Sequence, residues 1–241
     1  MRCKIISEIA SNWEGNMDKA KKLIMESKLA GADGVKFQMW RASDLYTTDH
    51  PEWNNIIKSE LSLEQITELK QYADEVEIDF FCSAFYPDAV AHLESLNVKQ
   101  YKVASRTCLF EDPWSLETLQ SKADTKKKII ISMGMGGEKN RINEIFNDNE
   151  TLYCYCISEY PTNFDKINWD DAKKFTGFSD HTLGINAAVI FACLKKEQND
   201  EEAYIEKHVK LKDSIGPDAS TSIDTDQLKK LVDIIRQIEK I

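Results

Sequence analysis

The stretch Tyr204-Ile-Glu-Lys-His-Val-Lys-Leu-Lys-Asp-Ser-Ile-Gly-Pro-Asp-Ala-Ser220 is the part of the sequence from which the fold can be inferred. It starts as a short apolar strand over 204–209 that presents His208, and it then enters a polar loop carrying Asp218. The segment Phe178-Ser-Asp-His-Thr182 has the same form, with His181 at the end of an apolar run and a helical pattern after it. Two histidines that end successive strands can meet at one mouth of a barrel, where neutral imidazoles bind metal ions. The alternative is that each histidine merely ends its strand.

Strand-like runs alternate with helical or connecting segments along the whole chain. The strand-like runs cover residues 4–10, 34–39, 79–85, 100–105, 127–133, 152–157, 176–181 and 204–209. Helical patterns cover residues 17–30, 63–76, 88–96, 113–119, 185–194 and 225–238. Eight strand–helix repeats in about 250 residues predict an α/β fold with a parallel sheet closed into a (β/α)8 TIM barrel. A doubly wound sheet is the alternative, but no Gly-x-Gly-x-x-Gly follows the first strand.

The length and composition predict a single domain over residues 1–241. The chain has 241 residues, of which 42% are hydrophobic, and this is enough to build one sizeable core. No low-complexity linker divides it. A longer insertion at 44–61 follows the second strand, and on a barrel it would lie over the top face as a lid or a partner surface.

Charge and apolar patterning exclude several classes of protein. The net charge of −10 argues against general binding to nucleic acid or to a membrane surface. No apolar run approaches the ~20 residues of a membrane span, and the start of the chain lacks the apolar region of a signal peptide. The six cysteines fall mostly in predicted strands or apolar helix faces, which is typical of reduced thiols. The predicted location is therefore the cytoplasm.

Reactive groups in this fold come from the carboxyl ends of the strands and the loops that follow them. The polar residues found there are Glu8, Asn12, Lys36, Gln38, Ser83, Lys102, Ser105, Arg106, Thr107, Ser132, Ser158, Tyr160, Ser179, His181, Glu206, His208 and Asp218.

Two lysines inside apolar strands are the most informative of these residues, because an unpaired buried charge is costly. Lys36 lies in Val-Lys-Phe-Gln and Lys102 in Tyr-Lys-Val-Ala-Ser. If both point into the barrel, two ammonium groups meet several hydroxyls, which is a binding place for a phosphate or a carboxylate. The alternative is that both lysines extend outward to solvent. Glu8 could pair with one of them, transfer a proton or hold a substrate hydroxyl.

A series of short motifs runs in consistent order from about residue 5 to the last helix. They are Ile6-Ser-Glu-Ile-Ala-Ser-Asn-Trp-Glu-Gly15, Ala30-Gly-Ala-Asp-Gly-Val-Lys-Phe-Gln38, Phe80-Phe-Cys-Ser-Ala-Phe85, Tyr101-Lys-Val-Ala-Ser105, Ile131-Ser-Met-Gly-Met135, Tyr160-Pro-Thr162, Gly177-Phe-Ser-Asp-His-Thr182, Ile205-Glu-Lys-His208 and Gly216-Pro-Asp218. Together they resemble the sialic acid (N-acetylneuraminate) synthase family, whose barrel domain condenses phosphoenolpyruvate with an N-acetylated sugar.

The resemblance implies a set of site residues. His181 and His208 would be metal ligands for a divalent cation, Mn²⁺ or Mg²⁺, and Glu8 is the acidic residue of the first strand. The implied phosphoenolpyruvate contacts are Lys36, Ser83, Lys102, Ser105, Ser132, Ser158 and Ser179. The implied sugar-side residues are Gln38, Tyr160 and Asp218.

By the same resemblance, the cation polarises the aldehyde of an open-chain, ManNAc-like aldose. Carbon 3 of phosphoenolpyruvate attacks that aldehyde, water adds at carbon 2, and phosphate leaves with carbon–oxygen cleavage. The product is a 3-deoxy-2-ulosonic acid, and the chain is expected to be a phosphoenolpyruvate-dependent transferase.

The resemblance covers the barrel domain only. The family normally adds a C-terminal antifreeze-like domain that contributes an arginine to the sugar's acyl group, and here another chain, such as a separate capping protein, would have to supply it. Family members form dimers, so a homodimer is a further expected partner. Arg106-Thr107 stands where the family has Gly-Asp or Gly-Glu, so an acid near the sugar is lost and a cation gained, and we expect Arg106 either to replace that arginine or to contact an anionic group on the sugar.

Two other functions remain open from the sequence. One is a non-catalytic sugar- or phosphate-binding relative, or a subunit that works only with a cap. The other is a barrel lyase or aldolase in which Lys36 or Lys102 forms a Schiff base.

Overall fold

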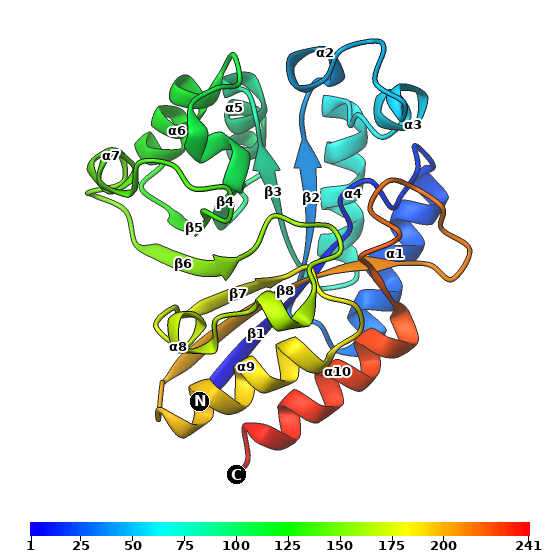
Figure 1. Ribbon diagram of the computed structural model, residues 1–241. Helices are drawn as coiled ribbons and strands as arrows, with labels where there is room; N and C mark the ends of the chain where they lie inside the picture. The colour runs from blue at the N-terminus through cyan, green and yellow to red at the C-terminus, as the bar shows by residue number, and fades with distance from the viewer.

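A closed barrel of parallel strands forms the centre of the protein. The computed structural model describes residues 1–241, and its strands pair in sequence order until β8 returns to pair with β1. The strands are β1 (Arg2–Glu8), β2 (Gly34–Met39), β3 (Asp79–Ala84), β4 (Gln100–Val103), β5 (Lys128–Ser132), β6 (Thr151–Cys156), β7 (Gly177–Asp180), β8 (Glu202–Lys210) and the short β9 (Ile223–Asp224). The predicted (β/α)8 TIM barrel is confirmed, and the chain forms it as a single domain (Figure 1).

Helices follow the strands and cover the outside of the barrel. They are α1 (Met17–Ala30), α2 (Ala42–Leu45), α3 (Trp53–Lys58), α4 (Leu63–Glu75), α5 (Pro87–Ser95), α6 (Ser115–Asp124), α7 (Lys139–Ile145), α8 (Trp169–Ala172), α9 (Asn186–Glu197) and α10 (Thr225–Ile238). The helix expected at 113–119 begins two residues later and continues to Asp124. The helices α2, α3, α7 and α8 were not predicted, because each is too short to show a helical period.

The longest helices begin and end where side chains satisfy their free backbone groups. Asn16 accepts hydrogen bonds from two backbone N–H groups at the start of α1, and Gly31 ends that helix with a φ of +87°. Asp224 and Gln227 form a capping box at the start of α10. The helices α1, α10 and α9 lie side by side outside β1 and β8 (Figure 1). These contacts fix the seam where the barrel closes.

Inward-facing side chains fill the barrel in layers. An apolar layer in the lower part of the barrel consists of Ile6, Phe81, Ile130, Leu152, Cys154 and Tyr204. Gly177 of β7 completes this layer because a Cβ there would lie 2.5 Å from the Cys154 sulfur and 2.8 Å from Leu152. On β1, β3, β5, β7 and β8 the next inward positions, two residues further along, are the polar Glu8, Ser83, Ser132, Ser179 and Glu206. Because side chains on one face of a strand recur every two residues, a polar layer lies directly above the apolar layer.

The insertion after β2 packs against the rim of the barrel. Its residue Ile56 forms a small buried cluster with Trp40, Ala42 and Phe85, and Figure 1 shows α2 and α3 beyond the end of β2. This packing makes the insertion part of a cavity wall, while its role as a lid stays a prediction. All six cysteines are free thiols. None of the helices combines the length and the apolar character needed to cross a lipid bilayer.

Candidate active site

A small polar pocket lies at the carboxyl ends of the strands. Its volume is about 40 Å³. The lining side chains come from all eight strands of the barrel and from the segments that directly follow β4, β6 and β7: Glu8, Lys36, Gln38, Ser83, Lys102, Ala104, Ser105, Ser132, Cys156, Tyr160, Ser179, His181, Glu206 and His208. We call this the inner pocket. Both lysines point into it, so the alternative in which they extend outward to solvent is wrong.

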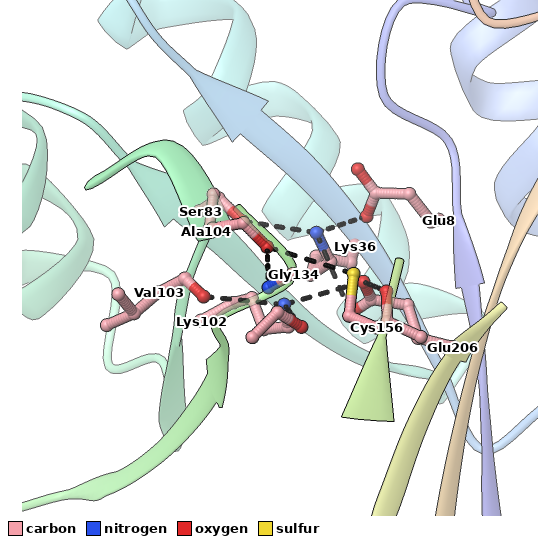
Figure 2. Close-up of polar contacts among 12 residues, drawn as sticks. Glu8, Lys36, Ser83, Lys102, Val103, Ala104, Gly134, Cys156 and Glu206 are labelled. Carbon is pink, nitrogen blue, oxygen red and sulfur yellow. Dashed lines mark hydrogen bonds and ion pairs between the residues drawn. The ribbon is translucent and has the colours of Figure 1, made fainter. Parts of the chain in front are cut away.

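Two buried lysines and two buried glutamates form a network in the inner pocket (Figure 2). The Lys36 ammonium lies 2.5 Å from a carboxylate oxygen of Glu8 and 3.8 Å from Glu206, and it donates to the Ser83 hydroxyl at 3.1 Å. The Lys102 ammonium lies 3.6 Å from Glu206. All four charged side chains are at most 5% exposed. The charges therefore balance each other within a site closed to bulk water.

Further hydroxyls complete the network. Lys102 donates to the Ser132 hydroxyl at 2.7 Å, and the Ser179 hydroxyl donates to Glu206 at 2.9 Å. The Gln38 amide donates to Glu8 at 2.7 Å. The pocket thus holds a ring of cations and hydroxyls in positions suited to an oxyanion.

The two glutamates differ in their electrostatics. Burial raises the pKa of Glu8 to about 7, which the neighbouring Lys36 only partly opposes. Burial acts in the same direction on Glu206, but the ammonium groups of Lys102 and Lys36 outweigh it and hold its pKa at about 2. Glu206 is therefore the permanent counter-ion of the two lysines, and Glu8 is the carboxyl that can exchange a proton near neutral pH.

The two histidines meet at one side of the inner pocket. The centroids of the His181 and His208 rings are 5.5 Å apart, and the ring of Tyr160 packs against His181 at 4.2 Å and His208 at 6.0 Å. Burial lowers the pKa of His208 to about 3, so its imidazole is neutral. The sequence expectation that both histidines reach the same mouth as the lysines agrees with this geometry.

The two imidazoles fit a divalent metal ion. His181 Nδ1 lies 2.7 Å from the carbonyl oxygen of Ile157, which favours a proton on Nδ1 and leaves the lone pair on Nε2. His208 Nδ1 is buried and has no hydrogen-bond partner. No group of three or more His, Cys, Asp or Glu side chains is arranged to hold a metal. An ion bound here would therefore take most of its ligands from substrate and water.

A larger cavity opens beside the inner pocket. Its volume is about 300 Å³, and we call it the outer cavity. It is lined by Gln38, Tyr46, Phe85, Ala104, Ser105, Arg106, Met135, Ser158, Tyr160, His208 and Asp218. The two spaces share Gln38, Ala104, Ser105, Tyr160 and His208, so a molecule in one can touch a molecule in the other.

The residues predicted for the site divide between these two spaces. The inner pocket brings together Glu8, Lys36, Ser83, Lys102, Ser132, Ser179 and His181. The outer cavity alone holds Arg106, Ser158 and Asp218, while Gln38, Ser105, Tyr160 and His208 line both. Ser158, expected with the lysines, thus lines the outer cavity and not the inner pocket.

Residues 23–241 match the NeuB family. The chain belongs to the NeuB family. This membership confirms the resemblance to sialic acid synthases inferred from the motifs.

Relatives of this NeuB family chain match it along almost its whole length. An uncharacterized protein of Methanocaldococcus jannaschii is 34% identical over 98% of the chain and 71% of its own length. The N,N'-diacetyllegionaminic acid synthase of Campylobacter jejuni is 32% identical over 98% of the chain and 76% of its own length. The crystal structure of an N-acetylneuraminic acid synthetase from Leptospira borgpetersenii, in complex with citrate, shares the fold with a TM-score of 0.87 at 24% identity, covering 100% of the chain and 85% of that protein.

Sequence reasoning assigned no role to two residues that lie in the inner pocket of this NeuB family barrel. Glu206 is the counter-ion shared by both lysines, and the signal for it was its position two residues before His208 on the same face of a strand. The Cys156 sulfur lies 3.9 Å from His181 Nδ1 and 3.7 Å from the Ser105 hydroxyl. Its strand was predicted at 152–157, but which face of that strand points into the barrel was not.

Buried ionic groups behind the pocket hold the ends of the strands. Asp180 and Lys207, each adjacent in sequence to one of the histidines, form a fully buried pair at 3.1 Å. Lys122 of α6 donates to the carbonyl oxygens of Ala84 and Lys102 at 2.8 and 3.0 Å. These contacts fasten the ends of β3, β4, β7 and β8 from outside the barrel.

Proposed function

We propose that this NeuB family barrel condenses phosphoenolpyruvate with an N-acetylated, ManNAc-like aldose and acts in carbohydrate biosynthesis. The observation that carries the proposal is the convergence of two buried ammonium groups and two imidazoles beside a cavity of about 300 Å³. An anion site next to a metal-binding pair and a cavity for a second molecule is the arrangement that a two-substrate condensation needs.

The inner pocket supplies the groups that bind phosphoenolpyruvate. Lys36 and Lys102 offer charge, and Ser83, Ser105, Ser132 and Ser179 offer hydroxyls. The pocket itself, at about 40 Å³, holds little more than one water molecule. The anionic substrate therefore sits at its mouth, and the lysines turn from the glutamates toward the incoming oxygens.

His181 and His208 would hold a divalent cation, Mn²⁺ or Mg²⁺, at the junction of the two spaces. When bound, such an ion supplies Lewis acidity toward a carbonyl oxygen of the acceptor. The histidines themselves orient that end of the acceptor, and Tyr160 packs over both rings and limits the access of water.

The remaining residues act on the acceptor and on protons. Gln38, Tyr160 and Asp218 line the outer cavity, where the aldose lies. Glu8 is held by Lys36 and Gln38 at the boundary and is placed to exchange a proton with the reacting groups. In the balanced reaction, carbon 3 of phosphoenolpyruvate bonds to the aldehyde carbon and water oxygen bonds to carbon 2. The carbon 2–oxygen bond to phosphate then breaks, which yields a 3-deoxy-2-ulosonic acid and inorganic phosphate.

The test is release of inorganic phosphate from phosphoenolpyruvate with Mn²⁺ and a panel of N-acetylated hexoses. We expect release only when an aldose is present, together with a new product that carries water oxygen at carbon 2. Glu8→Gln preserves the shape of the side chain and should lower kcat by about 10²–10⁴-fold. The exposed variant Glu111→Gln is the control. If the protein binds Mn²⁺ and phosphoenolpyruvate but turns over with no aldose, the proposal is wrong.

A cap-dependent form of the same activity is the second candidate. Apolar side chains are exposed around the mouth, with Met135 at 52%, Leu183 at 67% and Ile215 at 86%. A second protein, either another copy of the chain or a separate cap, would bury this rim. Specific activity that rises with protein concentration would indicate a homodimer. Activity that appears only when a small antifreeze-like protein is added would indicate a cap.

A Schiff-base mechanism is disfavoured by the surroundings of the lysines. Burial acts to lower the pKa of Lys102, but Glu206 outweighs it and raises that pKa above its usual value. Both lysines also pair with carboxylates, and a protonated amine is not a nucleophile. Borohydride should therefore trap no adduct between the protein and a carbonyl substrate.

A further inference from the structure

The charge of the outer cavity depends on an ion pair between Arg106, which lines the cavity, and Asp112, which does not. Arg106 is the only lysine or arginine that lines the cavity. Its Nε donates to Asp112 at 2.9 Å and its Nη2 donates to the other oxygen of the same carboxylate at 2.7 Å. The guanidinium also lies over the ring of Tyr46, 5.4 Å from the centroid. The two parallel hydrogen bonds to one carboxylate make the Arg106–Asp112 pair neutral overall, so Arg106 is not an unpaired cation for an anionic ligand.

A second carboxylate adds negative charge to the same space. Asp218 lines the cavity, and one of its oxygens accepts hydrogen bonds from the backbone N–H and the hydroxyl of Ser11. The side-chain partner of the Asp218 carboxylate is therefore the neutral Ser11 rather than a cation. The Asp218 carboxylate and the paired Arg106 guanidinium are the charged groups of the lining, and its other polar side chains are Gln38, Tyr46, Ser105, Ser158, Tyr160 and His208. These groups suit hydroxyls and amide oxygens.

Apolar groups form the rest of the wall. Phe85, Tyr46 and Met135 line the cavity together with the polar groups. A phosphate or carboxylate placed among them would lose water, meet Asp218 and find no unpaired cation. A neutral sugar with an acyl substituent would place its methyl group on the aromatic wall and its hydroxyls on Asp218.

We propose that the Arg106–Asp112 pair and Asp218 restrict the outer cavity to uncharged acceptors, so that the protein takes a neutral N-acylated aldose and rejects its phosphorylated form. This inference rests on the proposed function because it assigns the outer cavity to the acceptor. It goes further by naming the charge of that acceptor and the residues that select it.

The experiment measures binding and turnover separately. Calorimetry at fixed ionic strength, with phosphoenolpyruvate and Mn²⁺ present, compares N-acetylmannosamine and N-acetylglucosamine with their 6-phosphates. We expect at least one neutral sugar to bind, and its phosphate to bind about tenfold more weakly or worse. Equal or tighter binding of the phosphate overturns the inference, and so does binding of none of the four sugars.

Three variants test which residues carry the selection. Asp112→Asn frees the guanidinium, and we expect the ratio of the two affinities to shift about tenfold toward the phosphorylated sugar. Asp218→Asn removes the other carboxylate and should shift the ratio in the same direction, which keeps the test decisive if Asp112→Asn does not fold. Glu111→Gln removes the same charge from the neighbouring exposed residue and should leave the ratio unchanged. An unchanged ratio in both aspartate variants overturns the assignment.

Turnover separates this inference from the proposed function. If the neutral sugar binds selectively but no phosphate is released from phosphoenolpyruvate, the synthase proposal is wrong and the charge selection is upheld. If phosphate is released with phosphorylated aldoses as readily as with neutral ones, the charge selection is wrong and the synthase proposal is upheld.

Discussion

The Glu206 carboxylate lies 3.6 Å from the Lys102 ammonium, with both side chains at most 5% exposed. Lys36 approaches the same carboxylate at 3.8 Å, so one acid serves two cations. An anionic substrate that binds the lysines therefore replaces part of an ionic network that is already complete. The strength of substrate binding and the stability of the barrel both depend on this network.

Lys102→Met separates these two effects. The loss of one ammonium should weaken phosphoenolpyruvate binding by about tenfold to 100-fold, because a hydrogen bond to a charged group contributes about 1.5–3 kcal/mol. It should also destabilise the fold, because Glu206 keeps a buried charge with one partner fewer. Calorimetric titration with phosphoenolpyruvate and denaturant unfolding measure the two effects.

The double variant Lys102→Met/Glu206→Gln is the matched control for the first prediction. It restores the balance of charge, so stability should recover relative to Lys102→Met while phosphoenolpyruvate binding stays weak. Recovery of binding in the double variant would show that Lys102 acts only on the fold.

Replacement of either histidine should weaken metal binding. His181→Ala or His208→Ala removes one of only two imidazole ligands, and we expect Mn²⁺ affinity to fall at least about tenfold. Electron paramagnetic resonance of free Mn²⁺ measures this without any turnover. His92→Gln on the outer helix α5 is the control. A similar loss of Mn²⁺ affinity in that variant would mean that His181 and His208 do not form the metal site.

The buried Lys122 should make the stability of the protein depend on pH. Burial lowers its pKa to about 7 in the folded protein, from an ordinary value of 10.5. Between these values the unfolded chain holds one more proton than the folded chain, so the free energy of unfolding rises with pH through this group. The expected slope is about 1.4 kcal/mol per pH unit from about pH 7 to about pH 8.5, below the range in which free cysteines titrate.

The measurement is the difference in unfolding free energy between the natural protein and Lys122→Met at several pH values. The neutral amine has two N–H donors for its two carbonyl acceptors, so its hydrogen bonds persist as the charge is lost. Lys230→Met, at an exposed position, should show no such slope. A difference that is flat with pH would mean that Lys122 stays charged in the folded protein.

The Asp180–Lys207 pair should be important for stability. Both side chains are fully buried, so Asp180→Asn leaves the Lys207 ammonium without its carboxylate and should cost about 3–5 kcal/mol in unfolding free energy. Asp226→Asn, in the exposed pair with Lys212, should change stability little. Chemical denaturation of the two variants measures the contrast, and equal effects would contradict it.

Much of the fold could be predicted because its signals are local. The ranges 34–39 for β2, 17–30 for α1 and 225–238 for α10 agree with the structure to the residue. Each helix has an apolar face and a cap that can be read from neighbouring residues. The short helices α2, α7 and α8 carry no such period, and their positions depend on packing against the barrel.

The sequence predicted which residues form the candidate site, but it predicted only some of the contacts between them. Strand alternation put Lys36 and Gln38 on one face, and both line the inner pocket. The same rule could have predicted that Glu206 lies on the same face of its strand as His208. No local rule could have paired Arg106 with Asp112, because the chain turns between them and the pair forms only in that turn.

By itself, the sequence determined the order of strands and helices. It also determined that two histidines end successive strands and that two lysines lie inside apolar runs. These features could be predicted because backbone periodicity and strand alternation are properties of neighbouring residues. Only the tertiary structure decided which charges cancel. Glu206 meets two lysines because the barrel closes between β8 and β1, and Asp112 meets Arg106 because the chain turns at the rim. An electrostatic interaction depends on distance through space, and that distance exists only once the strands are joined in a ring.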